Sequence, residues 1–155
     1  MIERKLTHST FAVEREYKVP AEKVFQAFAD PSIKATWFDD PGGGWTLIDS
    51  SSDFREGGHE HNESRFGTDG PVSRFDARYH EIVEDLRIVY SYEMRVDGTR
   101  LSVSITSIEL AGTAAGTLLT MTEQGVFFDG LENTEQRRQG LRDVLEALAG
   151  AVEPG

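Results

Sequence analysis

The stretch that most constrains the fold of this chain is Arg15–Pro31, REYKVPAEKVFQAFADP. Apolar residues alternate through its approach, as expected for a strand with one buried face: Phe11, Val13, Tyr17 and Val19. Pro20 then suits the first turn of a helix, where its missing N–H costs nothing. That short helix has one apolar face, made of Val24, Phe25 and Phe28. Asp30-Pro31 ends it, and we expect a second short helix beyond the proline, so the chain begins with a strand and two short helices.

A series of strand patterns follows the aromatic pair Trp37-Phe38. Strands are predicted at residues 45–48, 59–66, 72–83, 87–96, 100–110 and 117–128. The turns between most of them are short, which favours an antiparallel meander. We expect a loop at residues 50–53, and a bulge or a close backbone approach at Gly57-Gly58.

The last element is a long helix. Asn133 or Thr134 can cap it, and Gln136 stands in a capping-box relation to Asn133. One apolar stripe follows, made of Leu141, Val144, Leu145, Leu148 and Val152. About 19 helical residues span roughly 28 Å, enough to cross a sheet. The pattern predicts an α+β helix-grip fold: a curved antiparallel sheet wrapped on this helix, enclosing a cavity. We expect one domain over residues 1–155, with its core at roughly 8–152.

Composition excludes several classes of function. The formal net charge is −11, with 16 basic and 27 acidic residues, and this sign repels phosphate backbones and anionic lipids. We therefore expect no nucleic-acid partner and no membrane insertion. The absence of cysteine excludes disulfides and thiolate chemistry. The first ten residues lack the apolar core of a targeting signal, which favours a cytoplasmic protein.

A set of short motifs in a fixed order carries a family resemblance. They are Arg15, Val19-Pro20-Ala21, Val24-Phe25, Asp30-Pro31, Trp37-Phe38, Arg55-x-Gly57-Gly58, Tyr79-x-Glu81-Ile82, Arg87-Ile88-Val89-Tyr90, Gly116-Thr117-x-Leu119-Thr120-Met121-Thr122 and Arg138-x-Gly140-Leu141. The chain resembles proteins similar to the C-terminal domain of the activator of the heat-shock-protein-90 ATPase. That family lies within the START-like (SRPBCC) superfamily of helix-grip domains.

Two positions depart from the family pattern. Leu141 stands where relatives usually carry tryptophan, and Glu84 where proline is common. The resemblance implies the fold more firmly than the function, because lipid carriers, polyketide cyclases, hormone receptors and co-chaperone domains share this architecture.

Polar residues on the strand at 59–66 suggest chemistry. Residues alternate in direction along a strand, so the face toward the cavity is either His59, His61, Glu63 and Arg65 or Glu60, Asn62 and Ser64. Two imidazoles and a carboxylate could bind zinc or iron. A polar, partly exposed strand without metal is the interpretation we favour, and we predict neither metal nor cofactor. The sequence holds no nucleophile motif.

On the next strand we expect Phe75 and Tyr79 to face inward, with Asp76, Arg78 and His80 forming an outer ladder. The resulting hypothesis is a non-catalytic domain that binds a small apolar or amphipathic ligand. The predicted pocket residues are Phe28, Trp37, Trp45, His59, His61, Phe66, Tyr90, Tyr92, Met121, Phe127, Leu141 and Leu145.

Two alternatives stay open. One is a cyclase or hydrolase that uses the histidines as cavity groups. The other is a chaperone-interacting stress-response module, although we expect no additional N-terminal domain before Met1. A homodimer is compatible with either.

Overall fold

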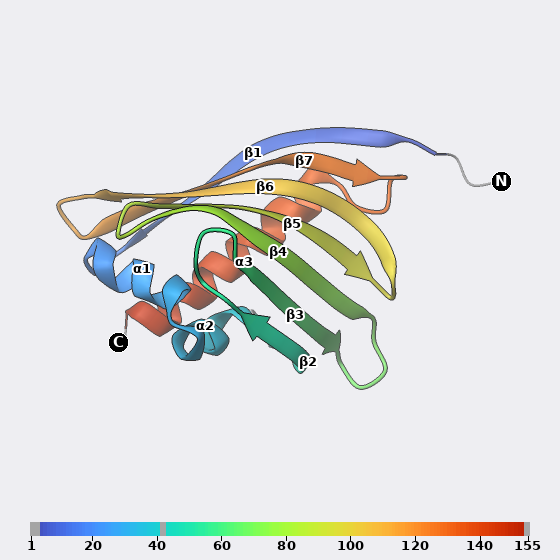
Figure 1. The fold of residues 1–155 in the computed structure, drawn as a ribbon, viewed down its shortest axis with the longest axis horizontal. Coiled ribbons are helices and arrows are strands. Elements are labelled where there is room, and N and C mark those ends of the chain that lie inside the picture. Colours follow the sequence, from blue (N-terminus) through green and yellow to red (C-terminus); the bar gives the residue numbers. More distant parts are fainter. Residues whose placement is uncertain (1–3, 41–42, 154–155) are drawn as a thin grey trace.

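A seven-stranded antiparallel sheet curves around the C-terminal helix in the computed structural model, which describes residues 4–40 and 43–153 (Figure 1). The strand order is β1-β7-β6-β5-β4-β3-β2. The strands are β1 Leu6–Tyr17, β2 Trp45–Ser52, β3 His59–Phe66, β4 Val72–Val83, β5 Arg87–Val96, β6 Thr99–Gly112 and β7 Thr117–Phe128. The helices are α1 Ala21–Ala29, α2 Pro31–Phe38 and α3 Thr134–Val152. The predicted helix-grip fold is therefore confirmed.

The helices begin where the sequence indicates. Pro20 precedes the first residue of α1. Asp30 caps α2 by accepting a hydrogen bond from the Ser32 N–H at 2.9 Å, and Pro31 occupies the first helical position. At α3 the Asn133 side chain accepts from the Gln136 N–H, and the Gln136 side chain accepts from the Asn133 N–H. The predicted capping box is confirmed.

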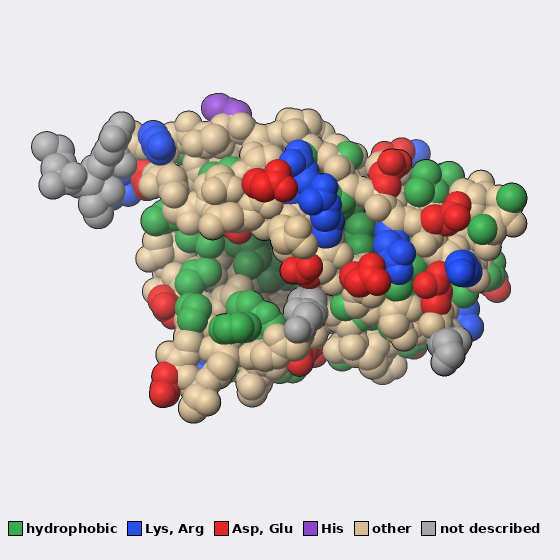
Figure 2. Space-filling view, turned by 180° about the vertical axis from the view of Figure 1, so that it is seen from behind, with side chains coloured by type: hydrophobic (Ala, Val, Ile, Leu, Met, Phe, Trp, Pro, Cys, Tyr) green, Lys and Arg blue, Asp and Glu red, His purple; other side chains and the backbone are tan. Residues whose placement is uncertain are grey.

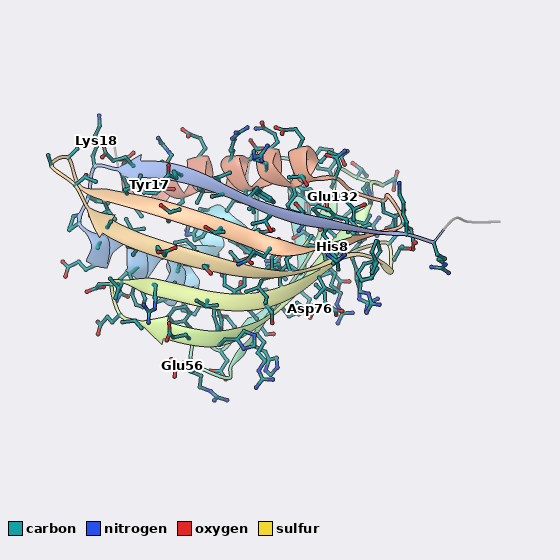
Figure 3. The ribbon with its side chains drawn as sticks, turned by 90° about the horizontal axis from the view of Figure 1, so that it is seen from above. His8, Tyr17, Lys18, Glu56, Asp76 and Glu132 are labelled. Carbon is teal, nitrogen blue, oxygen red and sulfur yellow. The ribbon has the colours of Figure 1, made fainter. Side chains whose placement is uncertain are left out.

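The closed part of the core lies where α1 and β1 meet the C-terminal half of α3. Leu145, Leu148 and Val152 are almost fully buried there. The Tyr17 hydroxyl donates to the Leu145 carbonyl at 2.8 Å, which ties β1 to the helix; Figure 3 shows Tyr17 at the end of β1. This half of α3 is core, as its stripe predicted.

The prediction of a loop at residues 50–53 is wrong for residues 50–52, because β2 continues to Ser52, and the loop begins at Asp53. Its serines pair with β3, with Ser50 opposite Asn62 and Ser52 opposite Glu60, after a register shift between Leu47 and Asp49. β2 is an edge strand, and exposed polar side chains are suitable there. The close approach at Gly58 is confirmed, since a Cβ on this residue would lie 2.0 Å from the Asp53 carbonyl oxygen.

The structure decides which face of each strand looks inward. On β3, Glu60 and Ser64 are buried whereas His59 is exposed. On β4, Ala77 and Tyr79 are buried, and the expected outer ladder is confirmed. Figure 3 looks onto the convex face of the sheet, where Asp76 of that ladder lies. None of the helices in the described ranges is both long and apolar enough to cross a membrane.

Candidate ligand pocket

A cavity of about 410 Å³ lies between the concave face of the sheet and the N-terminal half of α3. Every strand from β2 to β7 contributes to its wall, and α2 forms one side. Figure 2 shows this face of the molecule hollowed, with hydrophobic side chains in the depression. The volume is in the range of sites that enclose a small organic molecule.

Aromatic rings form a continuous wall from α1 to β5. The rings of Phe28 and Trp37 lie 5.0 Å apart edge to face, those of Phe38 and Phe75 lie 5.2 Å apart, and Phe75 lies 5.0 Å from Tyr92. The Trp37 indole donates to the Ala27 carbonyl at 3.0 Å, which fixes its orientation. Edge-to-face aromatic pairs and a hydrogen-bonded indole make a rigid apolar surface.

A buried polar network, here called the Arg137 cluster, closes one end of the cavity. Its members are Tyr92, Ser102, Thr106, Glu123, Glu132 and Arg137. Arg137 donates to the Tyr92 hydroxyl at 2.8 Å and to Ser102 at 2.7 Å, and it is paired with Glu132. Tyr92 in turn donates to Glu123 at 2.5 Å. Figure 3 shows Glu132 near the start of α3.

Burial sets the protonation of this cluster. It raises the pKa of Glu123 from its ordinary value, although the hydrogen bond from Tyr92 and the charge of Arg137 oppose the shift. Burial and the Glu123 charge raise the pKa of the Tyr92 phenol well above its usual value. Burial disfavours the charge on Arg137, but Tyr92, Glu132 and Glu123 outweigh it and raise the pKa of the guanidinium. Arg137 is therefore a permanent cation.

A second polar group, here called the Asp39 cluster, lies at the α2 side of the cavity and comprises Lys34, Asp39, Glu60, Asn62, Ser64 and Tyr79. Lys34 donates to both oxygens of Glu60, at 2.7 and 2.6 Å, and Tyr79 donates to the same carboxylate. Asn62 donates to Asp39 at 2.8 Å. Burial raises the pKa of Asp39, and the bond from Asn62 opposes that rise.

The pocket brings together seven of the twelve predicted residues: Phe28, Trp37, Trp45, Tyr90, Tyr92, Met121 and Leu141. Each of these residues borders the space between the concave face of the sheet and the helices. Leu141 lines the cavity together with Gly140, one position earlier on α3.

The other five predicted residues lie elsewhere. His59 and His61 are on the opposite face of β3 from Glu60 and Ser64, because side chains alternate along a strand. Phe66 is 47 % exposed and packs its ring 5.1 Å from Trp45. Phe127 is buried with the Arg137 guanidinium 5.3 Å from its ring, and Leu145 belongs to the closed core.

A metal at His59, His61 and Glu63 has no geometric support. No group of three His, Asp or Glu side chains within residues 4–40 and 43–153 is arranged to hold an ion. His61 instead contacts Asp76 at 2.8 Å and Asp49 at 3.5 Å, linking β2, β3 and β4 on the convex side. It also borders a smaller groove of about 220 Å³ beside α2.

Sequence reasoning offered Asn62 and Ser64 only as one of two alternatives, and it missed the charged members Asp39, Glu123 and Arg137 of the wall. Glu123 could have been found, because it is two residues from Met121 on β7 and so shares its face. Arg137 could have been found too, since it precedes Leu141 by one helical turn. Asp39 has no such periodic signal, because it follows the end of α2.

The fold and the pocket together define a helix-grip ligand-binding domain. The family model of Activator of Hsp90 ATPase homolog 1-like protein matches residues 18–153, and the chain belongs to that family. The resemblance stated from the motifs is therefore confirmed. Family membership supports ligand binding in general.

Several solved structures resemble this chain. A protein of Rhizobium leguminosarum is 38 % identical, with 99 % of each chain covered and a TM-score of 0.91. The Mll3558 protein of Rhizobium loti is 43 % identical, with 95 % of this chain and 99 % of that chain covered and a TM-score of 0.86. An AHSA1-like protein of Aeromonas hydrophila, 19 % identical with a TM-score of 0.73 over 94 % of this chain and 92 % of that chain, shares the fold. No curated protein matches the sequence.

Proposed function

We propose that this protein binds a small amphipathic molecule in the pocket and does not transform it. The observation that carries the proposal is an aromatic cavity of about 410 Å³ with hydrogen-bonded polar clusters at two sides. An apolar ligand body would gain about 25 cal/mol for each Å² removed from water. The polar clusters would orient a hydrogen-bonding head group.

The arrangement of titratable groups favours binding over catalysis. All four histidines are outside the pocket wall, so a cyclase or hydrolase that uses cavity histidines lacks the geometry it needs. Glu123 of the wall is paired with Tyr92, and the buried acid Glu60 of the Asp39 cluster is paired with Lys34. Such pairing stabilises a fixed surface rather than a reactive group.

Thermal shift and isothermal titration with a series of aryl-alkyl compounds test the proposal. A ligand that binds only the folded state raises the melting temperature as its concentration rises. The variant Leu141→Trp places an indole in the cavity and should weaken binding at least about 10-fold. Gln139→Trp adds the same bulk at an exposed position two residues earlier and should leave binding unchanged. A series without any stabilising compound, or equal binding by Leu141→Trp, would overturn the proposal.

A second candidate rests on the family description, which names an activator of the Hsp90 ATPase. It predicts that this chain associates with such a chaperone and raises its ATP hydrolysis. Pull-down and an ATPase assay with the purified chaperone test it. A lack of both association and stimulation would eliminate this role while leaving ligand binding intact.

A further inference from the structure

Carboxylates outnumber cations on the wall of the pocket. Among its described residues, Lys34 and Arg137 are positive, whereas four are acidic: Asp39, Glu123, Glu132 and Asp143. The whole chain carries a net charge of −11. A cleft of one charge sign with apolar walls concentrates counter-ions of the other sign. The cavity therefore disfavours an anionic head group such as a fatty-acid carboxylate.

Both cations of the wall are already neutralised. Arg137 is paired with Glu132 and lies 3.6 Å from Glu123. Lys34 contacts both oxygens of Glu60, and its side chain is only 12 % exposed. A ligand carboxylate would have to displace a protein carboxylate from one of these buried pairs. Breaking such a pair leaves an uncompensated buried charge, which is strongly unfavourable.

Asp39 is half-buried and differs from the buried acids Glu60 and Glu123. Of the described residues, only Asn62 donates a hydrogen bond to it, and that donor is a neutral amide. Glu60 and Glu123, by contrast, each lie within 4 Å of a cation and accept a hydrogen bond from a phenol. The charge of Lys34 also opposes the rise in the pKa of Asp39, but the salt bridge of Lys34 is with Glu60. Asp39 thus keeps acceptor capacity on the pocket wall.

Aromatic residues line the same cavity as this acceptor. Trp37 and Phe38 directly precede Asp39 in sequence, and all three line the cavity together with Trp45. The Lys34 ammonium already lies 4.5 Å from the centre of the Phe38 ring, so this ring accepts a cation. A carboxylate beside several aromatic rings is suited to an ammonium group, which gains both an ion pair and contact with the rings.

We infer that the pocket selects amphiphiles with a protonated amine as head group, held by Asp39 between these rings, with the apolar body along Phe75, Tyr90 and Met121. The inference rests on the proposed ligand-binding function and names the chemical class of its ligand. It distinguishes this pocket from a carrier site for fatty acids.

Three probes with one body test the head group: phenylbutylamine, phenylbutanol and phenylbutyrate, each titrated calorimetrically into the full-length protein. The amine should bind at least about 10-fold more tightly than the acid, with the alcohol between them. Asp39→Asn should weaken the amine about 10-fold and leave the alcohol unchanged. Asp69→Asn removes the same charge from an exposed turn after β3 and should change neither.

The outcomes separate the two claims. If the alcohol binds but the acid binds as tightly as the amine, or if Asp39→Asn leaves amine affinity unchanged, the inference is overturned and ligand binding stands. If none of the three probes binds, the proposed function fails and the inference fails with it. Equal losses of amine and alcohol affinity in Asp39→Asn would show that Asp39 shapes the pocket without recognising charge, which also overturns the inference.

Discussion

The two halves of α3 face the same sheet but have different surroundings. In the C-terminal half, Leu145, Leu148 and Val152 are at most 2 % exposed. In the N-terminal half, Leu141 and Val144 are only partly buried and line the cavity. One continuous helix therefore belongs to a closed core at one end and to an open pocket at the other.

The difference lies in what covers each half. α1 and the end of β1 close over the C-terminal half, with Tyr17 hydrogen bonded to the helix backbone. The N-terminal half faces aromatic rings across a space of about 410 Å³. Dense packing makes the C-terminal half of α3 contribute to stability, because protein interiors tolerate few voids. In the N-terminal half of α3, apolar surface is left for a ligand, and only the Arg137 cluster is tightly packed.

The largest expected effect concerns the Arg137 cluster. Arg137→Met removes the cation from the cluster and leaves Glu123 and Glu132 without their partner, so the free energy of unfolding should fall by about 3–5 kcal/mol. Urea denaturation measures it. Combining Arg137→Met with Glu123→Gln should recover part of this loss. If the single variant is as stable as the wild type, the cluster does not help to hold the pocket end together.

Truncation should separate the two halves of α3. Leu148→Ala creates a cavity in the closed core and should lower the free energy of unfolding by about 2–5 kcal/mol. Leu141→Ala removes a side chain that already borders open space, so its loss should lie well below that of Leu148→Ala. Equal losses in urea denaturation would show that both halves are packed alike.

Enlargement should separate them in the opposite way. Leu145→Trp overpacks the closed core and should cost about 1–3 kcal/mol, whereas the ring of Leu141→Trp enters existing space and should cost less than about 1 kcal/mol. Melting temperatures of the two variants give the comparison. A poorly folded Leu141→Trp protein would mean that core has been mistaken for cavity.

The smallest effect is a dependence on pH. Because burial raises the pKa of Glu123, the native state binds its proton more tightly than the unfolded state does. The contribution of Glu123 to stability therefore falls as pH rises from the ordinary glutamate pKa through the raised value, and it recovers on acidification. Wild type should gain stability relative to Glu123→Gln as pH falls from neutral toward the ordinary glutamate pKa. A difference that is constant with pH in urea denaturation would contradict this assignment.

Much of the fold could be predicted from local patterns. The capping box at Asn133 and Gln136, the boundary at Asp30-Pro31 and the close approach at Gly58 each depend on residues near one another in sequence. The strand at 59–66 was placed correctly, but both of its faces are polar. Its hydrophobic pattern therefore could not say which face is buried.

The sequence by itself determined the elements and the helix-grip arrangement, because turn chemistry and apolar periodicity act over a few residues. Only the tertiary structure decided that Glu60 faces inward and His61 outward, since this depends on the pairing of β3 with its neighbours. The Arg137 cluster joins β5, β6, β7 and α3, elements distant in sequence. Such contacts form only when the sheet curves around the helix, and they set the charge and shape of the pocket.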